Sequence, residues 1–514
     1  MKILFIYTDV STAIGYTAGI GSLSAFLKRE GHEVKLIHVS DELDYPFDLK
    51  RINKDIEVYT PGLICFSITT NQWYYSRHIG RNIRKEFNMP IIAGGHHPTS
   101  DADNVIEEFW LDMLCLGEGE NTLLEVVKRL EGKKEMDGVP NLIHKKNGKV
   151  IKELMKAWEH DIDSLPFDDR DIFDYAKIVE TRGGWAEVIV TRGCPYACSY
   201  CFNQPLIDGY KADLYAENKH NSFSVSKFAN RRRSVDSTIR MLKGLREKYN
   251  DITAFTFVDD IMAKTGDWFD EFARRYKEEI GLPYACTSQP LYFDEKLAEQ
   301  LKESGCKVVK MGVEAGDEAI RKKVLNRNIS NECLINVFKI AREYGLKPQS
   351  FNMIGIPGES VENMMETVRI NASMKPYIVW VSTFIPYPGT ELYYESIRKG
   401  MIDESKWHQV DSYRGASVLK EEYLSALEFK KIRVLFRWLL NENLENDAKE
   451  IFHANIQDLS SRSNEQWQNG TVEKIFEERD NEIDQDLRRK NISHYVSKKY
   501  INILWGNEYG YDLT

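Results

Sequence analysis

Short apolar segments alternate with amphipathic ones along the first third of the chain. The apolar runs are rich in isoleucine, leucine and valine, and the segments between them repeat apolar residues at helical spacing. We expect strands at residues 2–8, 33–39, 63–69, 90–95 and 112–120, with helices between them. Apolar strands that alternate with helices are typical of a doubly wound parallel sheet. The sequence therefore predicts an α/β domain over residues 1–150.

The middle of the chain continues this alternation after Pro166. We expect strands at residues 186–193, 254–260, 283–288, 308–314, 350–356 and 379–387, with helical stretches between them. Six β/α units in order predict a partial β/α barrel, and barrel enzymes place their chemistry at the carboxyl ends of the strands. We assign this barrel to residues 151–400 and a mostly helical, highly charged region to residues 401–514.

The loops after the strands of the first domain are rich in glycine, threonine and histidine. Doubly wound sheets bind ligands at these strand ends, and glycine lets a flat or phosphate-bearing ligand approach the backbone. Ordinary turn chemistry is the alternative. The fingerprint G-x-G-x-x-G does not follow the first strand, which argues against a dinucleotide. The residues concerned are Thr69 and Thr70, Gly94-Gly95-His96-His97-Pro98, and Gly117-Glu118-Gly119-Glu120.

Three of the eight cysteines lie in the segment TRGCPYACSYC, residues 191–201. Cys194, Cys198 and Cys201 have the spacing Cys-x3-Cys-x2-Cys, whereas a structural zinc site usually has four protein ligands. Each iron of a [4Fe-4S] cluster takes one external ligand, so three thiolates leave the fourth iron for a small chelating molecule. We favour this cluster over a zinc site that a distant residue completes. The remaining cysteines stand alone in the sequence, as small buried residues do.

This segment resembles the radical SAM superfamily, in which Cys-x3-Cys-x2-Cys binds a [4Fe-4S] cluster. Tyr200, the aromatic residue before the third cysteine, is also typical of that family. The resemblance implies that S-adenosylmethionine (SAM) chelates the open iron. It further implies that an electron from the cluster cleaves SAM to a 5′-deoxyadenosyl radical, and that a donor such as flavodoxin or ferredoxin supplies the electron.

Other strand ends of the expected barrel fit the same family. Carboxylates there suit the SAM amine, and a guanidinium suits its carboxylate. The loop Gly355-Ile356-Pro357-Gly358-Glu359, after the fifth strand, resembles the loop that lines adenine. The resemblance implies SAM contacts from Tyr200, Asp259, Asp260, Ser288, Glu314, Arg327, Gly355 and Pro357.

A doubly wound domain directly before a radical SAM barrel resembles the cobalamin-dependent radical SAM enzymes. The glycine loops of the first domain and Leu165-Pro166 in the linker are similar to that subfamily, and the resemblance covers about residues 1–400. The loop from Asp9 to Gly15 lacks the histidine that many cobalamin proteins place below cobalt, so we expect no histidine ligand from it. The implied cobalamin contacts are Thr69, Thr70, Gly94, Gly95, His96, Gly117, Glu118 and Gly119.

These features predict an enzyme with three cofactors: a [4Fe-4S] cluster, SAM and cobalamin. The activity we favour is methylation of an unactivated carbon in a small molecule or natural-product intermediate. A cobalamin-dependent radical SAM cyclase or ring-rearranging oxidoreductase, without methyl transfer, is the alternative. The intact cysteine motif argues against a binding protein without turnover. The lack of a second cysteine cluster argues against a methylthiotransferase.

Composition and charge limit the partners and the location. The chain has 514 residues, a net charge of −10 and no apolar run long enough for a spanning helix. We therefore expect neither nucleic acid nor a membrane as partner. The start MKILFIYTDVST lacks the basic region of a signal peptide. Clustered cysteines that serve a metal fit a reducing compartment, so the cytoplasm is the expected location.

Two neighbouring segments after the cysteines lack a recognisable motif. Residues 203–230 are polar with several aromatic residues, and they are expected to form a long loop. Such loops are usually functional or disordered, so a cover over the active site is one of two alternatives. Arg231, Arg232 and Arg233 suit a substrate carboxylate or phosphate, but we favour a solvated helix start.

Overall fold

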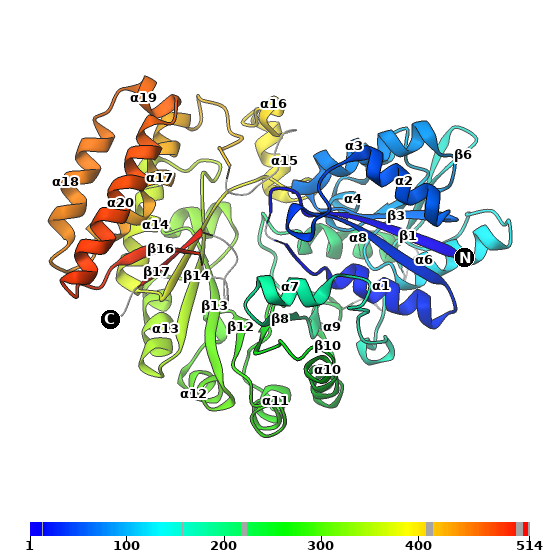
Figure 1. The fold of residues 1–514 in the computed structure, drawn as a ribbon, viewed down its shortest axis with the longest axis horizontal. Coiled ribbons are helices and arrows are strands. Elements are labelled where there is room, and N and C mark those ends of the chain that lie inside the picture. Colours follow the sequence, from blue (N-terminus) through cyan, green and yellow to red (C-terminus); the bar gives the residue numbers. More distant parts are fainter. Residues whose placement is uncertain (13, 157, 217–223, 408–414, 500–506, 512–514) are drawn as a thin grey trace. The chain divides into compact units, whose positions relative to one another are not determined.

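The computed structural model describes residues 1–12, 14–156, 158–216, 224–407, 415–499 and 507–511. It divides into two compact units (Figure 1). The N-terminal unit comprises Met1–Ile252 and Pro386–Tyr394. The C-terminal unit comprises Thr253–Ile385, Glu395–Trp407 and the described residues from 415 onwards.

A seven-stranded sheet in the order β2-β1-β3-β4-β5-β6-β7 forms the centre of the N-terminal unit. β1 to β5 run parallel, and β6 and β7 add an antiparallel hairpin at one edge. The doubly wound sheet expected from the sequence is therefore confirmed. Its strand order reverses beside β1, which is where such sheets bind ligands. The strands are β1 (Lys2–Thr8), β2 (Glu33–Val39), β3 (Leu63–Ser67), β4 (Ile91–Gly94), β5 (Met113–Cys115), β6 (Leu142–Lys146) and β7 (Lys149–Lys152).

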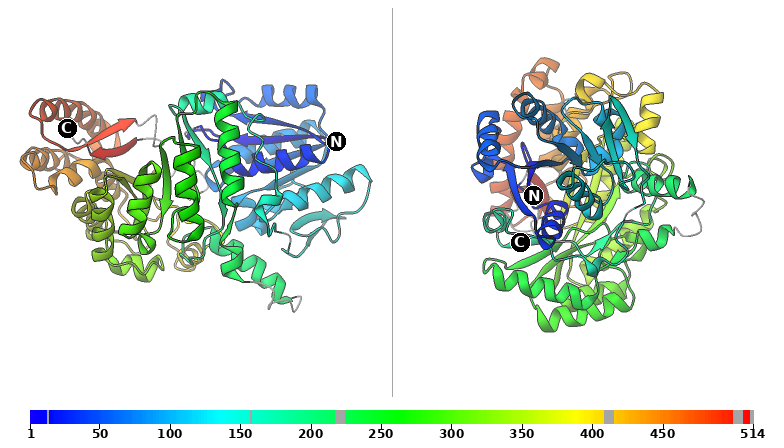
Figure 2. Two further views of the ribbon diagram at one scale, coloured as in Figure 1. Left: turned by 90° about the horizontal axis from the view of Figure 1, so that it is seen from below. Right: turned by 90° about the vertical axis from the view of Figure 1, so that its right-hand side faces the viewer.

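Helices cover both faces of this sheet, as the right-hand view of Figure 2 shows. α1 packs against α6, and α2 packs against α3. Ile52 and Ile56 on α2 and Ile79 and Ile83 on α3 are buried in the core, because residues four apart lie on one helix face. The helices are α1 (Ala18–Arg29), α2 (Leu49–Tyr59), α3 (Trp73–Glu86), α4 (His96–Ser100), α5 (Ala102–Ile106), α6 (Glu120–Glu131), and the 3-10 turns η1 (Asp41–Leu43) and η2 (Thr70–Gln72).

The rest of the N-terminal unit carries the cysteines. β9 and β10 form an antiparallel ribbon in which Arg231 pairs with Arg192. Residues 203–216 form helix α8, so the expectation of a loop is wrong for this part, while residues 217–223 lie outside the described residues. The elements are η3 (Ile162–Ser164), α7 (Tyr175–Thr181), β8 (Trp185–Val188), β9 (Thr191–Arg192), α8 (Asn203–Ala216), α9 (Val225–Phe228), β10 (Arg231–Arg232) and α10 (Val235–Lys248).

In the C-terminal unit, β11 to β15 are parallel neighbours in chain order, and helices alternate with them as expected. β17 pairs antiparallel with β15 and β16 at the edge. The strands are β11 (Ala254–Phe257), β12 (Tyr284–Ser288), β13 (Cys306–Glu314), β14 (Lys347–Ile354), β15 (Ile378–Thr383), β16 (Tyr495–Lys499) and β17 (Asn507–Tyr511). The intervening elements are α11 (Asp267–Glu279), η5 (Pro290–Tyr292), α12 (Glu295–Ser304), the π-helical turn η6 (Ile320–Val324), α13 (Asn331–Glu343) and α14 (Val361–Met374).

The end of the chain is mostly helical, as expected. α17 packs on α14 (Figure 1). The ring of Trp438 on α17 contacts the rings of Phe452 on α18 and Phe476 on α20. Among the described residues, no helix is long and apolar enough to cross a membrane. The helices are α15 (Glu391–Arg398), α16 (Glu404–Trp407), α17 (Ala426–Glu442), α18 (Lys449–Ser460), α19 (Asn464–Gln468) and α20 (Thr471–Arg489).

Candidate cluster and cofactor-binding site

The cysteine loop follows β9 directly, and Gly193 fixes its start. Gly193 has φ +91°, and a Cβ atom there would lie 2.7 Å from the Cα of Ala229, so the position requires glycine. Cys198 is buried, whereas Cys194 and Cys201 are partly exposed, and no disulfide joins cysteines in the described part of the chain. Three reduced thiols in one partly exposed loop are the donor set that a [4Fe-4S] cluster with an open iron needs.

The residue after the third cysteine contacts the first residue of α4, just after β4. The rings of Phe202 and His96 stack with centroids 4.2 Å apart. Gly95 has φ +99°, and a Cβ atom there would lie 2.9 Å from the backbone of Ile68, just after β3. The position therefore requires glycine for the close approach of the two strand-end loops. Within this unit, the cysteine loop touches a loop that is expected to hold cobalamin.

Glu118 connects the loop after β5 to both strands of the ribbon. Its carboxylate pairs with Arg192 on β9 at 3.1 Å and with Arg231 on β10 at 2.5 Å, and these side chains are largely buried. Arg192 also pairs with Glu120 at 2.6 Å. Burial alone would raise the pKa of Glu120, but the Arg192 guanidinium outweighs it and lowers this pKa to about 2. Because Arg192 lies two residues before Cys194, the network holds the cysteine loop to the loop after β5.

The arginine run after the cysteines is buried rather than solvated. Arg231 and Arg233 are only 7% and 5% exposed, so the prediction of a solvated helix start is wrong for them. Arg231 pairs with Glu118, and Arg233 donates to the carbonyl of Ile162 at 3.1 Å. The sequence gives no sign of the first pair, because Glu118 lies 113 residues before Arg231.

Helix α8 contributes a residue that the sequence analysis missed. The hydroxyl of Tyr210 accepts from the amide of Glu118 at 3.3 Å and from Nδ2 of Asn141 at 3.1 Å. Gly117 has φ +64°, and a Cβ atom there would lie 2.6 Å from the same hydroxyl. The packing of α8 therefore requires glycine at position 117. The Glu118 carboxylate forms ion pairs with Arg192 and Arg231. If this loop contacts cobalamin, we expect its backbone groups to make the contact, because the Glu118 side chain is already paired.

Thr69 and Thr70 lie at the end of β3, and both are partly exposed. The Thr70 hydroxyl lies 3.4 Å from Nδ1 of His97, and the His97 ring packs on Trp73 with centroids 4.7 Å apart. Burial lowers the pKa of His97 to about 3, so this imidazole is neutral at physiological pH. His97 therefore packs within the loop, whereas His96 is exposed.

Replacement of His97 by asparagine should remove a pH dependence of stability. The folded pKa of about 3 lies below the unfolded value near 6.5, so the stabilisation is complete above pH ~6.5 and falls as the pH drops toward 3. Between pH 7 and pH 5 this loss is about 2 kcal/mol for one group. Urea unfolding at both pH values should show a smaller pH-dependent loss in the variant than in the natural protein. An equal loss in both proteins would contradict a neutral, buried His97.

The ends of β11 and β12 carry three of the expected SAM contacts. Asp259 is buried and Asp260 is exposed. The Thr287 hydroxyl donates to the carbonyl of Asp259 at 2.6 Å, and the Ser288 hydroxyl donates to the carbonyl of Ala263 at 2.9 Å. The loop after β11 is therefore tied to β12, and the Ser288 oxygen can still accept a hydrogen bond.

The end of β13 brings a carboxylate and a guanidinium together. Arg327 lies 4.0 Å from Glu314 and donates to the carbonyl of Gly312 at 2.9 Å and to Gln289 at 3.3 Å. Glu314 has φ +72°, a strained conformation for a residue with a side chain, and the register shifts beside it. Such strain is common at binding sites. The pair is suited to the amine and carboxylate of an amino acid.

The glycine loop after β14 is organised by Glu359. Its Oε2 atom accepts from the amides of Gly355 at 2.7 Å and Ile356 at 3.0 Å. Burial raises the pKa of Glu359 to about 8, despite these two hydrogen bonds. Gly355 has φ +79°, and Pro357 is buried. The sequence identified the loop but not the carboxyl group that folds it.

Two family models match these parts of the chain. The B12 binding domain matches residues 6–127, and the Radical SAM superfamily matches residues 188–370. The first match contains the strand-end loops of the N-terminal sheet, and the second contains the cysteine loop and β11 to β14. The chain therefore carries a B12 binding domain and a Radical SAM domain together, the combination expected of a cobalamin-binding radical SAM enzyme. Its two domains give it the predicted cofactor set of a [4Fe-4S] cluster, SAM and cobalamin.

Curated relatives include both methyltransferases and cyclases. An uncharacterized methyltransferase of Pyrococcus horikoshii is 26% identical over 84% of this chain and 90% of that protein. Cytidylyl-2-hydroxyethylphosphonate methyltransferase of Streptomyces wedmorensis is 25% identical over 76% of this chain and 79% of its own. Anaerobic magnesium-protoporphyrin IX monomethyl ester cyclase of Rubrivivax gelatinosus is 22% identical over 77% of this chain and 70% of its own.

Solved structures share the fold at low sequence identity. The radical SAM methyltransferase TsrM from Kitasatospora setae, with cobalamin and a [4Fe-4S] cluster bound, has a TM-score of 0.60 at 17% identity. The match covers 77% of this chain and 78% of that one. The cobalamin-dependent SAM radical enzyme OxsB, with aqua-cobalamin bound, has a TM-score of 0.67 at 14% identity. It covers 97% of this chain and 82% of its own.

Proposed function

We propose that the protein transfers a methyl group from SAM to an unactivated carbon of a small molecule, using cobalamin as the carrier. The contact between the cysteine loop and the strand-end loops carries this proposal. Phe202 stacks on His96, and Glu118 pairs with Arg192. Methylation of an unactivated carbon needs the radical source and the methyl carrier close to one substrate atom. Contact between the two loops supports that arrangement.

Each unit would contribute its own contacts: the cysteines of the N-terminal unit to the cluster, and the strand ends of the C-terminal unit to SAM. Cys194, Cys198 and Cys201 would hold the cluster through their thiolates. Glu314 would accept from the SAM amine, and Arg327 would donate to its carboxylate. The cluster and cobalamin supply the radical and methyl-transfer chemistry, while the protein positions the reactants and excludes water. An electron donor such as flavodoxin or ferredoxin would reduce the cluster.

The cobalamin site in this proposal has no histidine from the loop after β1. Asp9 holds that loop, because its carboxylate accepts from the Gly15 amide at 2.9 Å and lies 2.9 Å from Nε2 of His38. The backbone of Gly94 and Gly95 and the hydroxyls of Thr69 and Thr70 would contact the cofactor. These groups offer close backbone approach and neutral hydrogen bonds, which suit a large uncharged ring edge with amide side chains.

Isotope labelling tests the proposed reaction. The reconstituted protein is incubated anaerobically with a reductant, a metabolite extract and SAM that carries a deuterated methyl group. We expect a product with the mass gain of one deuterated methyl group, together with S-adenosylhomocysteine and 5′-deoxyadenosine. Omission of cobalamin during reconstitution should abolish the labelled product.

A cyclase is the second candidate, because the cyclase from Rubrivivax gelatinosus is among the relatives. The same assay separates the two functions. A cyclase would form 5′-deoxyadenosine and a product that has lost hydrogen, without label and without S-adenosylhomocysteine. That outcome would replace methyl transfer with ring formation as the function.

A further inference from the structure

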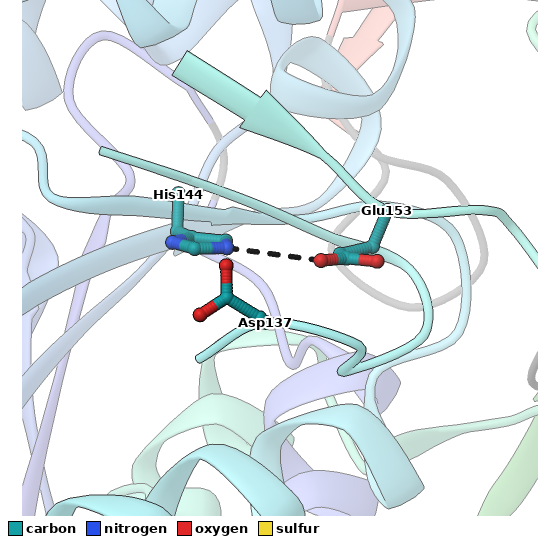
Figure 3. Close-up of side chains that lie close together, drawn as sticks. All are labelled: Asp137, His144 and Glu153. Atoms are coloured by element: carbon teal, nitrogen blue, oxygen red, sulfur yellow. Dashed lines mark ion pairs between the residues drawn. The ribbon is translucent and has the colours of Figure 1, made fainter. Parts of the chain in front are cut away.

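Three potential metal ligands converge at the edge of the N-terminal sheet, outside the residues considered so far. Asp137 lies in the segment after α6, His144 lies on β6, and Glu153 follows β7 (Figure 3). One ligand atom from each residue lies within 4.8 Å of the others. Figure 3 shows a carboxylate oxygen of Asp137 and the Glu153 carboxylate facing the same side of the His144 ring. Convergence from three segments gives the arrangement of a chelating site.

The environment of His144 is independent evidence for a bound ligand. Its side chain is only 3% exposed, and its Nε2 atom has no hydrogen-bond partner among the residues that the structure describes. The nearest carboxylate oxygen, Oε1 of Glu153, lies 3.9 Å away, which is too far for a hydrogen bond. β6 holds the residue between Met113 of β5 and Ile151 of β7. A buried polar atom without a partner costs free energy, and a bound cation would satisfy it.

Each of the two carboxylates has an oxygen available for a cation. Glu153 accepts from the Gly138 amide at 2.7 Å through Oε1, which leaves Oε2. Asp137 pairs with Lys146 at 2.5 Å through Oδ2, which leaves Oδ1. The hydrogen bond from Lys146 lowers the pKa of Asp137, so its carboxylate is charged at neutral pH. Lys146 also pairs with Glu135 at 3.1 Å, so it keeps an anionic partner if Asp137 turns toward a metal.

We propose that Asp137, His144 and Glu153 bind one zinc ion, with water as the fourth ligand. Zinc takes imidazole and carboxylate ligands at about 2.0–2.2 Å in four-coordinate sites. Calcium and magnesium prefer oxygen ligands alone, so the imidazole argues against them. Asp137 is 45% exposed, so its side chain can rotate inward to shorten the distances. The ion would fasten the segment after α6 to the β6–β7 hairpin.

Zinc binding to the reconstituted holoenzyme tests this proposal. The cysteine positions are then filled by the cluster, and iron analysis checks that they stay filled. Equilibrium dialysis against zinc, followed by metal analysis, should find about one zinc per chain in the natural protein. Asp137→Asn and Glu153→Gln should each weaken zinc binding at least about tenfold. Zinc should also raise the unfolding temperature of the natural protein but not that of Glu153→Gln.

Glu135→Gln is the matched control, because Glu135 is 75% exposed, contacts the same lysine and lies outside the chelating set. It should bind zinc as the natural protein does. His144→Gln provides a second test at the buried ligand, with circular dichroism as a check of folding. The proposal is overturned if the natural protein binds no zinc, or if Asp137→Asn and Glu153→Gln bind it as tightly as Glu135→Gln.

Discussion

Replacement of Cys198 by alanine is expected to abolish cluster binding and, with it, all cleavage of SAM. Each thiolate of the motif would hold one iron, so the loss of one leaves two irons without protein ligands. Anaerobic reconstitution should yield about four irons per chain in the natural protein and less than about one in the variant. Chromatography should detect 5′-deoxyadenosine from the natural protein but not from Cys198→Ala. Cys198 is buried next to partly exposed Cys194 and Cys201, so a water molecule cannot readily take its place.

Cys333→Ala is the control for this experiment. Cys333 is partly exposed on α13 and lies outside the motif, so its variant should keep the iron and the cleavage of SAM. Circular dichroism of both variants separates loss of the cluster from loss of the fold. A Cys198→Ala protein that keeps four irons and cleaves SAM would show that the motif does not hold the cluster.

Replacement of Glu118 by glutamine should cause the largest loss of stability among single charge changes at the site. Arg192 and Arg231 would keep their charges in a largely buried environment without the shared carboxylate. Removal of one partner of a buried ion pair costs about 3 kcal/mol or more. Urea unfolding of the apoprotein measures this loss. The variant should also lose iron faster from the reconstituted protein, because Arg192 adjoins the cysteine loop.

Glu125→Gln is the matched control for Glu118→Gln. Glu125 is 43% exposed and pairs with Arg129 one helical turn away, so its replacement should cost less than about 0.5 kcal/mol. The double variant Glu118→Gln with Arg231→Gln should lose less stability than the sum of the losses in the two single variants. Glu118 and Arg231 pair with each other, so each single replacement already breaks the same ion pair. Equal effects of Glu118→Gln and Glu125→Gln would show that the buried network does not support the cysteine loop.

Most of the fold could be predicted from the sequence, because the pattern of apolar residues within a single segment indicates a strand or a helix. Strands such as β1 and β3 are continuous apolar runs, and helices such as α2 carry apolar residues at a four-residue spacing. Helix α8 was missed because its apolar and polar residues do not form a stripe, and Tyr210 therefore gave no signal. Its position depends on contacts with Gly117 and Asn141, which are distant in sequence.

In the candidate site, too, local motifs could be predicted from the sequence, whereas contacts between distant residues could not. The cysteine motif predicted the cluster loop by spacing alone, and this loop lies within the Radical SAM match. The pairing of Glu118 with Arg192 and Arg231 could not be predicted, because it joins residues from separate elements of the fold. The side chains of Arg231 and Arg233 were predicted to be exposed to solvent, because their partners lie far away in the sequence. A run of charges usually lies on a surface, and only the folded chain shows which partners bury it.

Iron and cobalt analysis tests the central claim most directly. The claim is that one chain holds both a [4Fe-4S] cluster and cobalamin for methyl transfer. The protein is purified anaerobically from cells supplied with cobalamin, and both metals are measured in the same sample. We predict about four irons and about one cobalt per chain. About four irons without cobalt would contradict the claim, because the radical chemistry would then operate without the methyl carrier.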